Sequence, residues 1–130
     1  MGMIKKYGKI IIPGDVSIWP HELRVAKILA SVGFVVEFLP TRNHKTADVL
    51  VDGVEYEIKS PETCRLSSIE QLLRKALKQS PNIIIDTFRC RIQEERLCGY
   101  LIYKCRNQKQ IKRMLFIARS GEIVDIKKLV

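Results

Sequence analysis

One stretch, residues 47–61 (ADVLVDGVEYEIKSP), constrains the fold of this chain more than any other. Two apolar runs flank the dipeptide Asp52-Gly53, and Asp-Gly between such runs is a strong signal for a two-residue β-hairpin turn. Because side chains alternate between the two faces of a strand, the sequence predicts what each face of the hairpin presents. The apolar face holds Val49, Val51, Val54, Tyr56 and Ile58, and the opposite face holds Asp48, Leu50, Glu55, Glu57 and Lys59.

The second face of this hairpin sets Asp48 directly across from Glu57. Like charges opposite each other destabilise a sheet, where favourable pairs contribute about 0.2–1 kcal/mol. A divalent cation would offset the repulsion, because magnesium takes carboxylate oxygens and leaves positions for water and phosphate. The alternative is an exposed face whose charges are solvated, with Lys59 partly neutralising Glu57. The hairpin alone leaves both interpretations open.

The composition bounds the remaining possibilities. With 130 residues, 46% of them hydrophobic, the chain is expected to form one globular domain. A net charge of +9 favours a polyanionic partner: nucleic acid first, then an acidic membrane surface or an acidic protein. No apolar run approaches membrane-spanning length and no N-terminal segment resembles a signal peptide, so we expect a cytoplasmic protein that is not bound to a membrane.

The four cysteines give no sign of a metal site or a disulfide framework. They form no CxxC pair, and neither histidine completes a metal-ligand spacing with them. We expect reduced, mostly buried thiols and no structural zinc at Cys64, Cys90, Cys98 and Cys105.

Apolar periodicity and turn signals outline the other elements. Pro20 opens a first helix and Gly33 follows its end. Ser67 is the predicted N-cap of a second helix, with Glu70 completing a capping box. In chain order we expect an N-terminal arm or edge strand in residues 1–18, a helix from residue 20, a buried strand at 34–39, the hairpin, a helix after 67, a buried strand at 82–86, a helix near 92–106 and a terminal hairpin at 114–126.

Glu22 stands out on the first predicted helix. It precedes Val25, Ala26 and Leu29 at helical spacing, which places it on the inward face. Burial of a carboxylate is costly unless the group is paired or bound to a metal. Its position in the first helical turn has a simpler explanation, a favourable interaction with the helix dipole.

Two basic segments are candidates for contact with a phosphate backbone. Arg42, His44 and Lys45 come immediately before Asp48, and they either contact phosphates or form a solvated loop. The segment 104–113 has basic residues and no acidic one, so it is a second candidate patch.

The arrangement of these residues resembles the PD-(D/E)xK nuclease superfamily. The similarity rests on Glu22 on the first helix, Asp48 opening the second strand of the core and Glu57-Ile58-Lys59 on the third. Pro20-His21-Glu22, the hairpin stretch, SSIEQLLRKALKQSPNIIID and LFIARSGEIVDI look like the C-terminal tRNA-nuclease toxin domain of contact-dependent growth-inhibition proteins. Such domains end a long secreted protein, whereas this chain begins with methionine, so we expect a standalone relative or a domain expressed alone.

The resemblance implies an α/β (α+β) fold with a restriction-endonuclease-like core. That core is a mixed central sheet flanked by helices, in the order α-β-β-β-α-β, followed by a C-terminal helix and hairpin. On this basis residues 1–130 form a single nuclease-like domain. Residues 19–86 are its catalytic core, residues 87–130 its C-terminal helix and hairpin, and residues 1–18 the arm or edge strand.

The resemblance also implies hydrolysis of phosphodiester bonds with a divalent metal, magnesium or alternatively manganese. Asp48 and Glu57 would be the main metal ligands, Glu22 a ligand directly or through water, and the backbone carbonyl of Ile58 a further one. Lys59 would orient the attacking water or stabilise charge on the phosphate. Expected substrate-binding residues are Arg42, His44, Lys45, Gln71 and Lys75, of which Gln71 is equally well explained as a surface residue.

Three functions remain in competition at this stage. The first is a metal-dependent RNA nuclease, favoured for tRNA by family likeness, for which an acidic immunity or inhibitor protein is an expected partner. The second is a DNA nuclease of the same superfamily, in repair, restriction or a mobile element. The third is a non-catalytic basic module that binds nucleic acid or a protein. The sequence does not distinguish RNA from DNA, because no motif in it is known to contact a 2′-hydroxyl.

Overall fold

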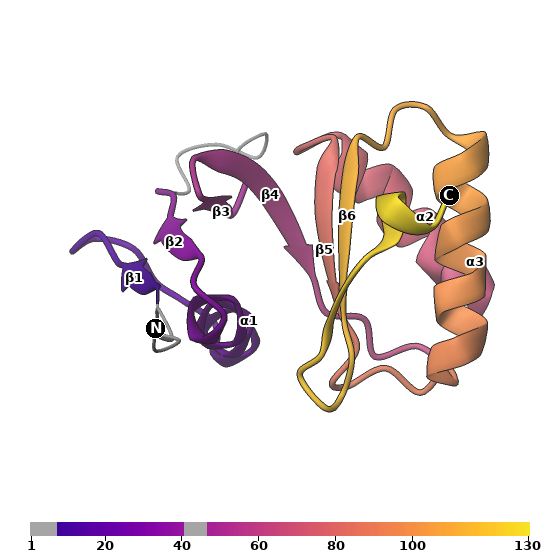
Figure 1. Cartoon of the computed structure of the whole chain (residues 1–130), viewed down its shortest axis with the longest axis horizontal. Coiled ribbons are helices and arrows are strands. Elements are labelled where there is room, and N and C mark those ends of the chain that lie inside the picture. Colours follow the sequence, from indigo (N-terminus) through magenta and orange to yellow (C-terminus); the bar gives the residue numbers. More distant parts are fainter. Residues whose placement is uncertain (1–7, 41–46) are drawn as a thin grey trace, which may run out of the picture.

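The described part of the chain forms a mixed sheet that curls around its first helix (Figure 1). The computed structural model describes residues 8–40 and 47–130. Within these residues the sheet has seven strands in the spatial order β1 to β7. The strands are β1 (Lys9–Ile11), β2 (Val35–Phe38), β3 (Val49–Val51), β4 (Val54–Lys59), β5 (Asn82–Asp86), β6 (Arg113–Ile117) and β7 (Ile123–Asp125).

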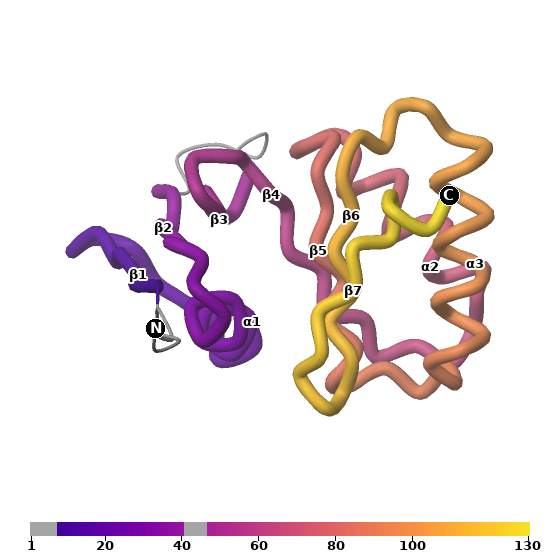
Figure 2. Tube along the Cα trace, viewed as in Figure 1, coloured from indigo at the N-terminus to yellow at the C-terminus, as the bar shows by residue number. Residues whose placement is uncertain are grey.

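Three α-helices and one short 3₁₀ helix accompany the sheet in the described residues. They are α1 (Pro20–Ser31), α2 (Leu66–Leu77), α3 (Glu94–Asn107) and η1 (Ile126–Leu129). Helix α1 lies within the bend of the sheet, while α2 and α3 lie together on the other side, with η1 beside α3 (Figures 1 and 2). The expected element order is therefore confirmed, and β1 is a strand at the sheet edge within residues 1–18, where an arm or an edge strand was expected. Among the described elements only η1 was not expected. No described helix has the length and apolar composition needed to cross a membrane.

Two apolar cores explain why the helices lie where they do. The core around α1 takes Val25, Ala26 and Leu29 from the helix, the side of α1 predicted from its apolar spacing. The core around α2 and α3 is built on the opposite sheet face, where Ile83 and Ile85 are buried. Central strand β5 is buried at every residue because both of its faces are covered.

The hairpin predicted around Asp52-Gly53 is confirmed, including its register. Val51 pairs with Val54 and Val49 with Tyr56, and three of these four side chains are buried, with Val54 partly so. Both turn residues have positive φ, 48° at Asp52 and 83° at Gly53, as a type I′ turn requires. The Asp52 carboxylate also accepts the backbone N–H of Val35 at 2.8 Å, which ties the turn to β2.

Two local predictions were wrong. Helix α2 begins one residue before Ser67, with Arg65 as N-cap and no side-chain capping bond, because Leu66 already packs against the core. Glu70 therefore closes no capping box and instead pairs with Lys104 and Arg74. Asp48 does not form a ladder pair with Glu57, since the β3–β4 ladder ends at Val49 and Tyr56.

The free thiols are confirmed at all four cysteines. Cys90 and Cys105 are buried and Cys98 is partly buried, but Cys64 is exposed, so the expectation of burial fails there. The exposed position lies in the loop before α2.

The turn gives a direct test of the hairpin geometry. Gly53→Ala should lower the free energy of unfolding by about 1–2 kcal/mol, because an L-residue is strained at positive φ. The cost should come from the backbone alone, since nothing lies within 4 Å of the position that a Cβ would take.

Gly99→Ala is the matched control for urea denaturation. Gly99 lies inside α3 with equally open surroundings, so alanine there should raise stability by about 0.5–1 kcal/mol. Equal effects of the two substitutions would contradict the assigned turn.

Candidate active site

The candidate site lies where strand β4 changes partners. Tyr56 is the last residue of β4 paired with β3, and Glu57 is the first paired with the parallel strand β5. The β3–β4 ladder stops at this point, and Asp48 is the residue directly before β3 begins. The Asp48 carboxylate accepts the backbone N–H of Ile58 at 2.7 Å, and its own N–H donates to the Tyr56 carbonyl at 3.1 Å.

Glu57 is a carboxyl of this site whose ionised form is disfavoured. Only 6% of the residue is exposed, because its side chain lies on the sheet face that α2 and α3 cover. Burial first, and then the negative charge of Asp48, raise the pKa of Glu57 to about 7, while Lys59 acts in the opposite direction. The two carboxyls predicted to oppose each other are thus close neighbours, although they are not paired across a ladder.

Lys59 is the cation of this group. Its Nζ lies 3.2 Å from Oε2 of Glu57, and its side chain is partly exposed. The other carboxylate oxygen of Glu57, Oε1, is buried and has no hydrogen-bond partner among the described residues. A buried, unpaired carboxylate oxygen is rare because its desolvation is not compensated.

Glu22 approaches the same region from the first turn of α1. It is partly buried, which raises its pKa, and the charge of Asp48 raises that pKa as well. Its Oε1 accepts the N–H of Trp19 at 3.1 Å, so Glu22 caps the N-terminus of α1, a contact that was not predicted. Its neighbour His21 has a pKa lowered first by burial and then by Arg89, while Asp86 and Asp48 raise it.

Of the predicted metal site, the structure brings two carboxylates together, those of Asp48 and Glu57. The described residues contain no group of three or more acidic, histidine or cysteine side chains placed to hold a metal. Magnesium, however, is commonly bound through one or two carboxylates, with water and substrate phosphate completing its shell. The unpartnered Oε1 of Glu57 beside the Asp48 carboxylate suits such binding. Glu22 and the Ile58 carbonyl as further ligands stay predictions.

The predicted substrate-binding residues are only partly placed. Arg42, His44 and Lys45 lie outside the described residues. Gln71 and Lys75 are exposed on α2, consistent with a surface role as much as with contact to a substrate.

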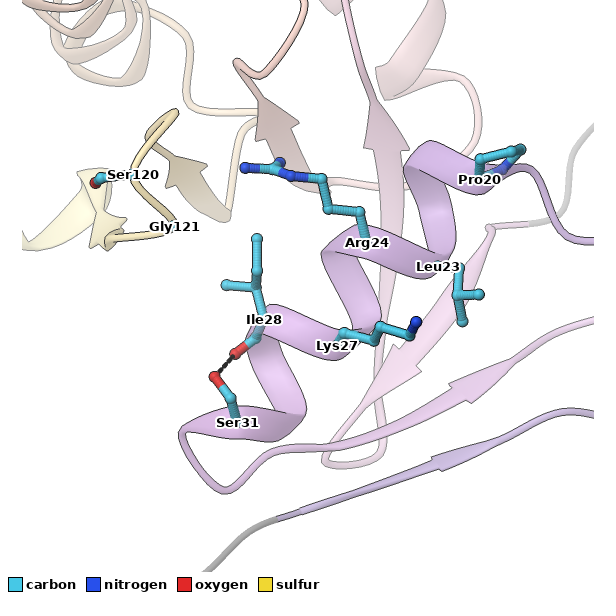
Figure 3. Close-up of a pocket in the computed structure, with 8 residues that line it drawn as sticks. All are labelled: Pro20, Leu23, Arg24, Lys27, Ile28, Ser31, Ser120 and Gly121. Carbon is cyan, nitrogen blue, oxygen red and sulfur yellow. Dashed lines mark hydrogen bonds between the residues drawn. The ribbon is translucent and has the colours of Figure 1, made fainter.

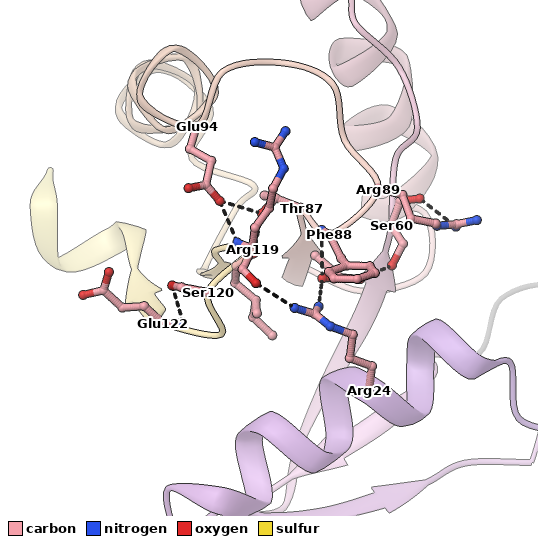
Figure 4. Close-up of polar contacts among 11 residues, drawn as sticks. Arg24, Ser60, Thr87, Phe88, Arg89, Glu94, Arg119, Ser120 and Glu122 are labelled. Atoms are coloured by element: carbon pink, nitrogen blue, oxygen red, sulfur yellow. Dashed lines mark hydrogen bonds and ion pairs between the residues drawn. The ribbon is translucent and has the colours of Figure 1, made fainter.

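Sequence reasoning missed a second polar cluster at the same edge of the sheet. Asp86, at the end of β5, is fully buried. Its carboxylate accepts hydrogen bonds from the Arg24 guanidinium at 2.6 Å and from the Ser60 hydroxyl at 2.9 Å, and Figure 4 labels these two donor residues. Arg24 also donates to the backbone carbonyl of Arg119. The signal available in the sequence was the aspartate that directly follows three consecutive isoleucines of β5.

A further set of hydrogen bonds, separate from those of Asp86, holds the loop that follows β5. Glu94 accepts the Thr87 hydroxyl at 3.1 Å and the Arg119 N–H at 2.6 Å (Figure 4). The Arg119 guanidinium donates to the carbonyls of Cys90 and Ile92. These bonds fix the loops at the carboxyl ends of the parallel strands β4, β5 and β6, which is the edge where open α/β sheets commonly bind ligands.

A pocket of about 670 Å³ between α1 and the β6–β7 turn is not part of the site. It is lined by Pro20, Leu23, Arg24, Lys27, Ile28, Ser31, Ser120 and Gly121 (Figure 3). None of these residues is acidic, so the pocket offers no oxygen ligands from carboxylates.

The raised pKa of Glu57 predicts an unusual pH dependence in metal-free protein. The folded state keeps this proton up to about pH 7, whereas the unfolded chain loses it near 4.5. Stability should therefore fall as pH rises from about 4.5 to 7 and level off above that window. Glu57→Gln should remove a decline on the order of 2–3 kcal/mol, measured by urea denaturation with a chelator present.

Glu55→Gln is the control for this titration, because it changes an exposed carboxyl on the same strand. It should leave the pH profile close to that of the parent protein. A Glu57→Gln profile that still declines as steeply would show that the carboxyl is not buried as described.

Comparison with known proteins identifies the family. The family model described as "Contact-dependent growth inhibition CdiA C-terminal domain" matches residues 45–123. The solved "CdiA-CT/CdiI toxin and immunity complex from Burkholderia pseudomallei" has a chain with a TM-score of 0.71 and 17% identity, over 91% of this chain and 98% of that one. At that identity the likeness shows the fold alone.

The comparison with curated proteins found no match. The family model covers most of the chain, including the hairpin with Asp48, Glu57 and Lys59 and the strands that support them. The chain therefore belongs to the contact-dependent growth inhibition CdiA C-terminal domain family.

Proposed function

We propose that this chain is the toxin domain of a growth-inhibition system and a metal-dependent nuclease of the PD-(D/E)xK type. Its proposed substrate is RNA, with tRNA favoured, and its proposed place of action is the cytoplasm of a target cell. One observation supports the chemistry above all: Asp48, Glu57 and Lys59 meet where β4 leaves β3, and Glu57 is buried with one oxygen unpartnered. The mixed sheet between α1 and α2 supports a restriction-endonuclease-like core.

Asp48 and Glu57 would hold a magnesium or manganese ion, with Glu22 and the Ile58 carbonyl as additional ligands. When bound, such an ion polarises a phosphate oxygen and lowers the pKa of a coordinated water. The backbone N–H of Ile58 fixes the orientation of the Asp48 carboxylate. Binding of the ion would remove the Glu57 proton, because the deprotonated carboxylate is the ligand form.

Lys59 has two tasks in this proposal. In the structure its Nζ lies 3.2 Å from the Glu57 carboxylate and partly neutralises that group. Once a cation compensates Glu57, the ammonium is free to donate to a phosphate oxygen, where charge develops during hydrolysis. A compact ammonium suits this, since it can follow the phosphate without a fixed planar geometry.

An immunity protein is the proposed partner. The structural relative is by its description a toxin and immunity complex, and the net charge of +9 suits an acidic inhibitor. Such a protein would protect the cell that makes the toxin.

Incubation of the purified chain with tRNA, other RNA and plasmid DNA, with magnesium or with chelator, tests the proposal. We expect magnesium-dependent cleavage of RNA, fastest with tRNA. Lys59→Ala should reduce the rate at least about a hundredfold, the scale of losing one charge-stabilising donor. Its control is Lys78→Ala, an exposed lysine at the end of α2 that should retain full activity.

The outcomes separate the competing functions. Cleavage restricted to DNA would replace the RNA substrate but keep the chemistry. Salt-sensitive binding of RNA without cleavage under magnesium or manganese would contradict hydrolysis and favour a non-catalytic basic module. A folded Lys59→Ala variant that cleaves normally would remove Lys59 from the mechanism.

A further inference from the structure

A pocket of about 460 Å³ lies between the start of α1 and the segment that follows β5. Trp19, Pro20, His21, Arg24, Phe88 and Arg89 line it. It adjoins the carboxylate site, because His21 is close enough to Asp48 to sense its charge and Glu22 is the next residue along α1. None of the carboxylates assigned to the site lines it, so its chemistry is separate from hydrolysis.

Two aromatic side chains in this pocket are left open to solvent. Trp19 is 67% exposed and Phe88 is 56% exposed, although large aromatic rings usually supply much of a core. They come from distant parts of the chain, the N-cap of α1 and the loop after β5, yet they face the same cavity. An exposed pair of rings in one pocket is suited to stacking on a flat ligand.

Each ring is held in place from one side. The Arg24 guanidinium lies 4.2 Å from the centre of the Phe88 ring, and its salt bridge to buried Asp86 fixes it there (Figure 4). The Phe88 N–H also donates to Asp86. Trp19 stacks on His21, with the ring planes 16° apart. The rings are therefore preorganised, which lowers the entropic cost of binding.

One charge in the pocket suits a phosphate group. Arg24 and Arg89 both line the pocket, but Arg24 is paired with buried Asp86, which leaves Arg89 for a phosphate. Arg89 pairs with Glu62 at 2.9 Å, but both side chains are substantially exposed, so this ion pair contributes little and a phosphate can replace the carboxylate. Arginine presents a planar set of donors that matches phosphate oxygens.

We propose that this pocket binds an unpaired nucleobase of the nucleic-acid substrate, stacked against Trp19 and Phe88, with Arg89 on an adjoining phosphate. The proposal rests on the nuclease function proposed above. Stacking on aromatic rings accepts any base, and proteins that recognise RNA commonly contact bases that are unstacked and single-stranded. The pocket would thus select a single-stranded segment and hold the chain next to Asp48 and Glu57.

Trp19 is the only tryptophan of the chain, so its fluorescence reports directly on this pocket. We suggest titrating the full chain with hexauridylate while a chelator prevents cleavage. Base stacking should quench Trp19 in a saturable manner. An abasic oligonucleotide of the same length and charge should leave the fluorescence nearly unchanged.

Variants of Phe88 give the second readout. Phe88→Ala should weaken hexauridylate binding at least about fivefold, the lower end of measured base-stacking contributions. Phe88→Tyr keeps a ring and should bind as the parent does. Tyr103→Ala is the matched control, since it removes an equally exposed aromatic ring on α3, outside the pocket.

Two results would overturn the pocket assignment. One is equal quenching by the abasic oligonucleotide, and the other is unchanged hexauridylate affinity in Phe88→Ala. Either result would indicate that the exposed rings contact a protein partner and not a base. Because the titration needs no metal and no cleavage, its failure leaves the nuclease proposal intact. Base-dependent quenching in a protein that cleaves nothing would support the pocket while refuting hydrolysis.

Discussion

The candidate site depends on one feature of the sheet: strand β4 pairs with β3 up to Tyr56 and with β5 from Glu57 onward. A change of partner within one strand leaves backbone groups without a neighbouring strand. At Ile58 the backbone N–H forms no ladder bond with β3, and the Asp48 carboxylate accepts it instead. The same bond fixes the Asp48 side chain next to Glu57, so the fold and the site share one interaction.

The electrostatics of this point are unfavourable in the described structure. Glu57 is buried beside the negative charge of Asp48, and Lys59 compensates only one of its oxygens. An uncompensated buried charge destabilises a fold by roughly several kcal/mol. A carboxyl at this position is therefore unexpected unless it serves a function. A carboxyl whose pKa is raised by burial and by a neighbouring charge, as that of Glu57 is, is typical of functional positions. The pocket lined by Trp19 and Phe88, which we propose binds a nucleobase, lies beside this point.

The sequence allowed much of this to be predicted, for identifiable reasons. Asp52-Gly53 fixed the hairpin register because only that pairing places its valines and Ile58 on one buried face. The polar contacts were harder to predict from the sequence. The bond of Asp48 to Ile58 depends on where two strands separate, and the Arg24–Asp86 pair joins elements far apart in the chain, which no local pattern encodes. The start of α2 was misplaced because packing of Leu66 outweighed a capping preference.

The most direct measurement of the central claim is manganese-induced relaxation of backbone amide NMR signals in the metal-binding region. Small additions of Mn²⁺ should first broaden the amides of Asp48, Glu57 and Ile58, and Asp48→Asn should abolish that selectivity. The amide of Gly99, within α3, should remain sharp. Broadening centred on other carboxylates, or spread evenly over the surface, would contradict a cation site at the point where β4 changes partners.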